Sequence, residues 1–412
     1  MKDKKIYPWI VVGLLWVVAL LNYMDRQMLS TMKDAMMIDI VELESAANFG
    51  RLMAVFLWIY GFMSPVAGMI ADRINRKWLI VGSLFVWSFV TLMMGYCTTF
   101  NQVYVLRALM GISEALYIPA GLSLITDYHQ EKTRSLAVGI HMTGLYVGQA
   151  LGGFGATIAH TYSWETTFHW FGMIGIAYSV VLILLLQDKK DHMITKKAAA
   201  TEAENPITNA FKGLGMLFTN VAFWIILLYF ATPSLPGWAT KNWLPTLFAE
   251  NLSIDMSEAG PLSTFTIAIS SFIGVIVGGI LSDRWVQKNV RGRVYTGAIG
   301  LALTIPSLVL LGFGHNFLMI IGGGLCFGLG FGIFDANNMP ILCQFVSPRY
   351  RATAYGIMNM TGVFAGAAVT RFLGSSTDAG NLGHDFAMLA GLVLVALVIQ
   401  ILFLKPKTIN QQ

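Results

Sequence analysis

Apolar residues run along the chain in stretches of about 20, separated by short polar segments. Stretches of that length are typical of helices that cross the hydrocarbon core of a membrane. The pattern predicts twelve spans that use most of the chain, which leaves no segment long enough for a soluble catalytic domain. Their predicted ranges are 8–30, 50–71, 78–98, 101–127, 133–160, 167–187, 217–247, 260–283, 295–313, 316–346, 352–373 and 385–404.

Composition agrees with a membrane protein. The 412 residues are 56% hydrophobic and only 12% charged, about half the charged fraction of a soluble domain. The basic start and apolar core of the N-terminus resemble a signal peptide, but no small-residue cleavage site follows, so we predict a retained first helix. The three cysteines, Cys97, Cys326 and Cys343, fall in apolar spans and have no metal-site spacing.

The placement of basic residues predicts the orientation. With twelve spans, one set of loops shares a side with both termini, and 21 of the 27 Lys and Arg fall on that side. The positive-inside rule therefore predicts a multi-pass protein of the cell (inner) membrane with both termini in the cytoplasm. The net charge of +5 follows from this topology and does not call for a nucleic-acid partner.

Two segments recur in the second half of the chain. The spacing of Gly68, Asp72 and Arg73 in "GMIADRINRK" returns 211 residues later in "GGILSDRWVQKNVRGR". The segment "RSLAVGIHMTG", from residue 134, returns as "RATAYGIMNMTG", from residue 351. Repeats in corresponding loops predict two similar halves of six helices each.

The predicted fold is therefore an all-α membrane protein with twelve transmembrane helices in two six-helix bundles. The N-terminal bundle covers 1–187 and the C-terminal bundle covers 216–412. Between them, residues 188–215 form a polar, basic and Ala-rich linker that we expect to be a cytoplasmic tether.

The first span ends in an unusual polar segment, "NYMDR". A charge in mid-membrane costs at least about 2.5 kcal/mol, so such residues usually face a cavity or a partner. Asp25 and Arg26 could instead mark the end of the helix. Because Asn22, Asp25, Arg26 and Leu29 share one helical face with no Gly or Pro break, we favour a helix that lines a cavity.

The fourth span carries Arg107 and Glu114. Seven residues separate them, which is about 10 Å along a helix axis. That separation is too large for a tight pair on one straight helix, so we expect each to meet a partner from a neighbouring helix, with Asp25 and Arg26 the obvious candidates. A static ion-pair network that holds the first and fourth helices together is the alternative.

The chain resembles the major facilitator superfamily through "GMIADRINRK" and the similar segment in its second half. Within that superfamily "NYMDR", Arg107 with Glu114, and Pro119 resemble the anion:cation symporter family. That family includes bacterial hexuronate and galactonate carriers, sialin and the vesicular glutamate transporters. Spinster-type lysolipid carriers share much of the pattern.

The resemblance implies a division of roles. Asp25 and Glu114 would carry protons, Arg26 would bind the substrate carboxylate, and Arg107 would partner the acid. Chemistry supports this, because an arginine fork grips a carboxylate in two-point geometry. Burial favours the neutral carboxyl whereas a nearby arginine favours the ionised one, so a balanced carboxyl can change protonation as substrate binds.

Further polar and aromatic residues within the spans are candidates for substrate contact. In the N-terminal half these are Tyr23, Tyr60, Tyr117, His141 and Gln149, and in the C-terminal half Trp238, Asn242, Asp335, Asn337, Asn338 and Asn359. For Asp335, Asn337 and Asn338, which share one apolar span, we favour contacts to sugar hydroxyls over hydrogen bonds within the core. Lys241 could extend to the outer interface instead.

The resemblance also implies gates. Asp72, Arg73, Asp283 and Arg284 would form cytoplasmic ion pairs that hold the outward-open state and break on inward opening. The alternative is that these charges only fix topology.

The leading functional hypothesis is a proton-coupled importer of an acidic sugar or similar organic anion, such as sialate, hexuronate or aldonate. We expect a monomer surrounded by membrane lipid, with an organic anion and a proton as its small-molecule partners, and no cofactor, metal or nucleic acid. A spinster-like lysolipid carrier would need a more apolar cavity, and a nutrient sensor that does not transport would need an output domain. An enzyme is disfavoured, because the sequence offers no nucleophile–base constellation.

Overall fold

The computed structural model describes residues 6–129, 131–188, 218–219, 221–346 and 351–408. Every described element is a helix, which confirms the all-α prediction. The helices before the linker are α1 (Tyr7–Leu29), α2 (Lys33–Met36), η1 (Val41–Glu44), α3 (Ala46–Arg73), α4 (Arg76–Met94), α5 (Phe100–Ala115), α6 (Tyr117–Tyr128), α7 (Glu131–Gly152), α8 (Gly155–Thr161) and α9 (Trp164–Leu185). Those after it are α12 (Val221–Leu252), α13 (Met256–Val286), α14 (Gly292–Phe313), α15 (Phe317–Asp335), α16 (Asn338–Phe345), α17 (Arg351–Asp378) and α18 (Leu382–Phe403).

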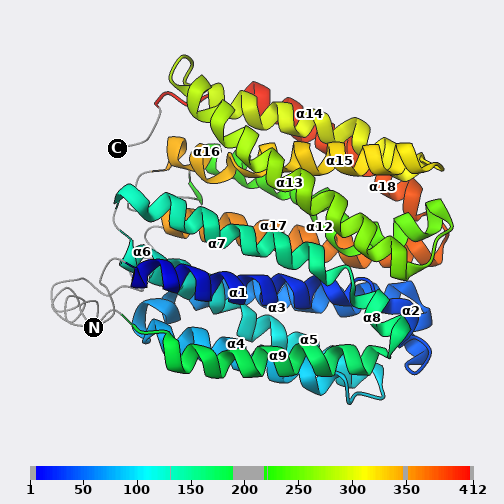
Figure 1. The fold of residues 1–412 in the computed structure, drawn as a ribbon. Coiled ribbons are helices and arrows are strands. Elements are labelled where there is room, and N and C mark those ends of the chain that lie inside the picture. The colour runs from blue at the N-terminus through cyan, green and yellow to red at the C-terminus, as the bar shows by residue number, and fades with distance from the viewer. Residues whose placement is uncertain (1–5, 130, 189–217, 220, 347–350, 409–412) are drawn as a thin grey trace.

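Figure 1 shows the long helices roughly aligned, with α1–α9 in one group and α12–α18 in the other. We call the side where both ends of the chain lie the terminal side, and the other the opposite side. Most of the predicted linker, 188–215, lies outside the described residues, so the boundary between the halves stays a prediction.

Ten helices among the described residues are long and apolar enough to cross a membrane, counting α5–α6 and α15–α16 as one each. The predicted fifth and eleventh spans, α7 and α17, are not among them. Both pack between the two groups of helices, α7 against α13 and α17 against α3. Helices packed between other helices contact less lipid, so they need fewer apolar residues than lipid-facing helices. The count of twelve spans remains a prediction.

The two groups of helices meet closely on the opposite side. A Cβ added to Gly374 of α17 would lie 2.5 Å from the Ala46 carbonyl oxygen of α3, and one added to Gly50 would lie 2.9 Å from the Thr370 carbonyl oxygen. Gly68 of α3 and Gly356 of α17 lie 18 residues away from these glycines, which is five full helical turns on the same faces. No described atom lies within 4 Å of a Cβ at either position, so α3 and α17 diverge toward the terminal side.

Asp378, the last residue of α17, adds a polar contact to this closure. Its carboxylate accepts hydrogen bonds from the Ser45 hydroxyl and from the Ala46 and Ala47 backbone N–H groups, at 2.7, 2.6 and 2.9 Å. Ser45 is the N-cap of α3, so a carboxylate from one group of helices satisfies the helix N-terminus of the other.

We predict that Gly374→Val destabilises the protein by about 1–3 kcal/mol, because the backbone of α3 cannot yield to the added side chain. Gly356→Val is the matched control on the same face of the same helix and should be close to neutral. The measurement is the thermal unfolding temperature of each purified variant in detergent. Equal unfolding temperatures for the two variants would contradict the close packing of α3 and α17.

We also predict that Asp378→Asn lowers the free energy of unfolding by about 0.3–1 kcal/mol, the usual value of a negative charge at a helix N-terminus. Although burial acts to raise it, hydrogen bonds from Ala47, Ser45 and Ala46 hold the pKa of Asp378 below its ordinary value. Its contribution is therefore complete above the unfolded pKa, about 4, and is lost as the pH falls through the lower folded value. Thermal unfolding of wild type and variant should differ at neutral pH and converge in acid, and a difference that persists in acid would argue against the carboxylate as the cap.

Candidate functional site

The polar end of α1 is buried. Asn22 is 0% and Asp25 4% exposed, Arg26 is partly buried, and residues 27–32 are all buried. The helix ends at Leu29, so Arg26 does lie in its last turn, as the alternative reading of the sequence held. Both charged side chains are nevertheless surrounded mainly by protein, but neither is among the residues that line the cavity described below.

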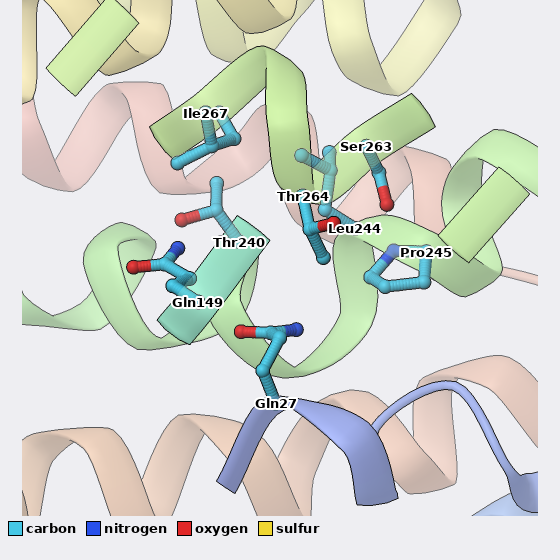
Figure 2. A pocket seen from close by; sticks show the side chains of 8 residues that line it. All are labelled: Gln27, Gln149, Thr240, Leu244, Pro245, Ser263, Thr264 and Ile267. Carbon is cyan, nitrogen blue, oxygen red and sulfur yellow. The ribbon is translucent and has the colours of Figure 1, made fainter. Parts of the chain in front are cut away.

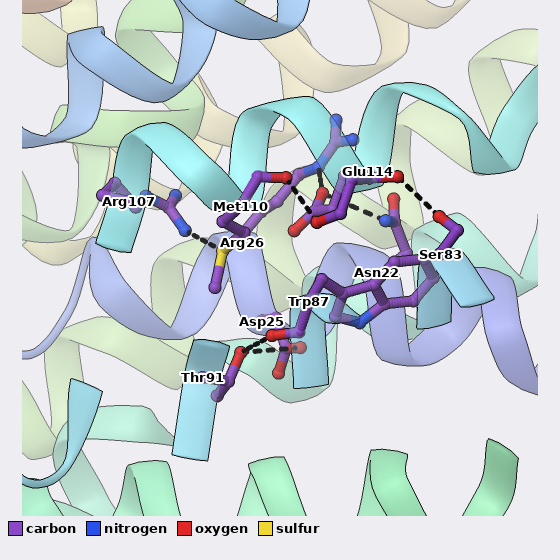
Figure 3. A network of polar contacts seen from close by, with 10 residues as sticks. Asn22, Asp25, Arg26, Ser83, Trp87, Thr91, Arg107, Met110 and Glu114 are labelled. Atoms are coloured by element: carbon purple, nitrogen blue, oxygen red, sulfur yellow. Dashed lines mark hydrogen bonds and ion pairs between the residues drawn. The ribbon is translucent and has the colours of Figure 1, made fainter. Parts of the chain in front are cut away.

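Arg26 and Glu114 form an ion pair across α1 and α5. The Arg26 Nε donates to Glu114 Oε2 at 2.5 Å, and Asn22 Nδ2 donates to the same oxygen at 3.0 Å (Figure 3). Glu114 is 0% exposed. The prediction that Glu114 meets a partner from the first helix is therefore confirmed, with Arg26 as that partner.

Three aromatic rings enclose the Arg26 guanidinium. Its Cζ lies 4.6, 4.9 and 5.1 Å from the ring centroids of Tyr60, Phe56 and Tyr23. The Nη2 of Arg26 and the Oε1 of Glu114 have no hydrogen-bond partner among the described residues. Both atoms are buried, so the pair holds one unused donor and one unused acceptor inside the protein.

Arg107 does not take the role that the family resemblance implied for it in this conformation. Its Nη1 donates to Met110 Sδ at 2.9 Å, and its guanidinium lies 4.5 Å from the Phe56 ring centroid. No ion pair within 4.0 Å joins it to any described carboxylate, although it interacts electrostatically with Glu114 and Asp25. Two helical turns separate it from Glu114, and Arg26 approaches that carboxylate more closely.

Asp25 occupies a different side of α1. Figure 3 shows its carboxylate near Thr91 and Trp87 of α4, whereas Arg26 reaches toward Glu114. Thr91 Oγ1 donates to Asp25 Oδ2 at 3.5 Å. Thr91 was not among the sequence candidates, since a lone threonine in an apolar span gives no distinctive signal.

A cavity of about 90 Å³ lies between the two groups of helices. Three of the predicted contact residues, Tyr23, Gln149 and Asp335, line it together with Lys241, so Lys241 faces the cavity. The remaining lining residues are Met142, Leu145, Tyr146, Gly237, Thr240, Ile267, Ser271, Phe327, Phe331 and Gly332.

A smaller recess adjoins this cavity where α1 meets α12 and α13, and Figure 2 shows Gln27 and Gln149 pointing into it. Gln27 Nε2 donates to the Lys241 backbone carbonyl at 2.8 Å. Pro245 explains why this carbonyl is available, because proline has no N–H to donate to the residue four positions earlier. A helix irregularity in α12 thus ties the two groups of helices together.

The other sequence candidates are placed less centrally. The Tyr117 hydroxyl donates to the Leu15 carbonyl, and buried His141 lies beside the Tyr117 ring, so both pack within the N-terminal helices. Asn337 Nδ2 donates to Ile333 in the preceding turn, and Asn359 is half-buried.

Two further candidates lie on α12. Asn242 Nδ2 donates to Thr370 Oγ1 of α17, and Trp238 packs against Lys241, whose Nζ lies 4.7 Å from the ring centroid.

The proposed gate is described only in part. The side chains of Asp72 and Arg73 lie outside the described residues. Asp283 Oδ1 lies 3.9 Å from Arg293 Nη2 of α14, within the same group of helices, and Arg284 is exposed. The open space around Gly68 is consistent with a terminal side that is not closed in this conformation.

Comparisons with known proteins agree with this architecture. The family model described as Major Facilitator Superfamily matches residues 15–370. The hexuronate transporter of Bacillus subtilis is 24% identical over 425 residues, covering 96% of this chain and 94% of its own. The chloroplastic sodium-dependent phosphate transport protein 1 of Arabidopsis thaliana is 25% identical, covering 96% of this chain and 78% of its own.

Among solved structures, a bacterial homologue of the human lysosomal transporter Spinster, in an inward-facing and unoccupied conformation, superposes with a TM-score of 0.79 at 19% identity. The match covers 98% of this chain and 97% of the other. At that identity the likeness concerns the fold.

We predict that Arg26→Met or Glu114→Gln alone costs about 3–5 kcal/mol, because each leaves a buried charge without its partner. The double variant should cost clearly less than the sum of the two, since neither charge then remains. A double-mutant cycle on thermal unfolding in detergent measures this coupling. Additive effects would show that the two side chains do not depend on each other.

Proposed function

Because the chain belongs to the Major Facilitator Superfamily, we propose that this multi-pass membrane protein is a proton-coupled transporter that imports an acidic sugar or related organic anion by alternating access. The observation that carries the proposal is the buried Arg26–Glu114 pair, which keeps the Arg26 Nη2 without a described partner. Relatives include a hexuronate transporter, whose substrate is an acidic sugar. Sialate, hexuronate and aldonate all fit this chemistry.

Coupling follows from competition for one guanidinium. When Glu114 is ionised, it holds Arg26. When it takes up a proton, its hold weakens, and a substrate carboxylate can bind the arginine fork in two-point geometry. Substrate and proton are therefore bound together. If either one bound without the other, a buried charge would be left without a partner, which is costly. Loss of the proton on the terminal side returns Arg26 to Glu114 and releases the substrate.

Asp25 and Arg107 have supporting roles in this proposal. Asp25 is a second buried carboxyl that can carry a proton, and it accepts a hydrogen bond from the Thr91 hydroxyl. Arg107 lies within electrostatic reach of both carboxyls and would stabilise whichever of them is ionised. The remaining sequence candidates that line the cavity, Tyr23, Gln149 and Asp335, would contact the body of the substrate.

The same proposal includes the topology and the gates. We propose twelve spans in two bundles, residence in the inner membrane with both termini in the cytoplasm, and a monomer as the working unit. Asp72, Arg73, Asp283 and Arg284 would pair on the terminal side only when that side closes. In this conformation Asp283 contacts Arg293 of its own group of helices instead.

A spinster-like lipid carrier is the second candidate, favoured by the superposition with the bacterial Spinster homologue. The polar residues around the cavity favour a hydrophilic substrate instead, because Lys241, Asp335 and Gln149 would all be desolvated by an acyl chain. A sensor that does not transport is less consistent with the tightly packed closure on one side and the open space on the other.

We predict that purified protein in proteoliposomes accumulates one or more sugar acids when an inward proton gradient is imposed. Arg26→Ala should abolish uptake, because it removes the anion ligand, whereas Arg51→Ala, an exposed arginine on α3, should leave uptake unchanged. Glu114→Gln should retain exchange of internal for external substrate and lose accumulation. Normal accumulation by Glu114→Gln would rule out its proposed role.

The assay needs two further arms. A sodium gradient replaces the proton gradient, since one relative is described as sodium-dependent, and a labelled lysolipid replaces the sugar acids. Accumulation driven only by the sodium gradient would show that sodium, and not the proton, is the coupled ion. Uptake of the lysolipid without uptake of any sugar acid would favour the spinster-like lipid carrier.

A further inference from the structure

The cavity holds a second cation and a second carboxylate that the coupling scheme above does not use. Lys241 comes from α12 and Asp335 from the C-terminal end of α15, and both line the cavity. The two interact electrostatically, yet no ion pair within 4.0 Å joins Lys241 to any described carboxylate. Asp335 instead accepts a hydrogen bond from Asn338 Nδ2 at 3.0 Å and stays exposed to the cavity.

The internal repeat places Asp335 where Glu114 lies in the first half. Glu114 opens the segment "EALYIP" and Asp335 opens "DANNMP", so each carboxylate precedes an alanine and stands five residues before a proline. Each lies where a long helix breaks. α5 ends at Ala115 and α6 follows, and α15 ends at Asp335 and α16 follows.

The repeat likewise places Lys241 where Arg26 lies. "NYMDRQ" begins at Asn22 and "GWATKN" begins 215 residues later, at Gly237. In both segments an aromatic residue precedes the cation by three positions and packs under it. The cation lies 5.1 Å from the Tyr23 ring centroid in the first segment and 4.7 Å from the Trp238 centroid in the second.

The two cations also approach each other. The Tyr23 ring lies 5.1 Å from the Arg26 Cζ and 5.8 Å from the Lys241 Nζ. The hydrogen bond from Gln27 to the Lys241 carbonyl fixes this approach through the backbone. A short molecule with an anionic group at each end could therefore reach both cations.

The two pairs differ in one respect. Arg26 is held by Glu114 in this conformation, whereas Lys241 is not held by Asp335. Among the described residues, three tyrosines also lie within electrostatic reach of Asp335, namely Tyr146, Tyr229 and Tyr355. Lys241 is thus the cation that an anion entering the cavity meets without first displacing a carboxylate.

We propose that Lys241 and Asp335 form a second anion-binding site, and that the protein selects acids with two carboxylates, one bound by Arg26 and the other by Lys241. This inference rests on the proposed function and narrows its substrate class to short sugar diacids. Asp335 balances the charge of Lys241 while the site is empty, and an incoming carboxylate takes over that role.

The test compares acids that share a carbon chain and differ at one end, where a CH2OH group replaces a carboxylate. Suitable pairs are gluconate with glucarate and galactonate with galactarate, titrated by calorimetry into purified protein in detergent. Wild type should bind the diacid roughly 10- to 100-fold more tightly, the usual effect of one hydrogen-bonded charge. Lys241→Gln should remove this difference and leave binding of the monoacid unchanged.

Two variants complete the design. Lys33→Gln, which removes a lysine on α2 outside the cavity, should preserve the preference for the diacid. Asp335→Asn should bind the diacid at least as tightly as wild type, because the competing carboxylate is gone while its shape is kept. Binding by this variant also shows that the protein still folds when residue 335 is changed.

Equal binding of monoacid and diacid by wild type, or an equal loss of both in Lys241→Gln, overturns the second site and leaves the proposed function intact. Wild type that binds no acid of either kind overturns both. A smaller preference for the diacid over the monoacid in Asp335→Asn also counts against the inference, because removal of a competing carboxylate should not weaken binding of the second carboxylate.

Discussion

The structure depends on the cost of burying a charge. Arg26 is enclosed by three aromatic rings and pairs with the Glu114 carboxylate, which also accepts a hydrogen bond from the Asn22 amide. In such surroundings an arginine needs an anion at all times, but the identity of that anion is free to change. This single requirement joins α1 to α5, places the pair beside a cavity, and makes the exchange of a protein carboxylate for a substrate carboxylate chemically sensible.

A few close contacts define the boundary between the two groups of helices. On the opposite side, glycines such as Gly50 and Gly374 bring backbones close enough that a single added carbon would clash. Asp378 caps α3 there through hydrogen bonds that need no side-chain packing. On the terminal side the corresponding faces at Gly68 and Gly356 have open space, so the close packing is confined to one end of these two helices.

The internal repeat links these features. Each half supplies a cation above an aromatic ring and a carboxylate at a helix break, yet only the first half closes its pair. In the proposed scheme the two halves would supply two anion sites, one at Arg26, which a carboxylate already occupies, and one at Lys241, which lines the cavity. Pro245 has no N–H to donate, so the Lys241 carbonyl is free to accept a hydrogen bond from Gln27. A missing hydrogen bond within α12 thus contributes to the arrangement of the site.

The sequence by itself determined the helical membrane architecture, because stretches of about 20 apolar residues leave few other solutions. It also determined that Asp25, Arg26 and Glu114 would be buried, since charges in such stretches must avoid lipid. The tertiary structure alone decided that Arg26 rather than Arg107 meets Glu114, that Asp25 turns toward Thr91, and that Lys241 faces the cavity. These choices depend on the rotation of each helix and on side-chain reach across helices, and a one-dimensional pattern contains neither.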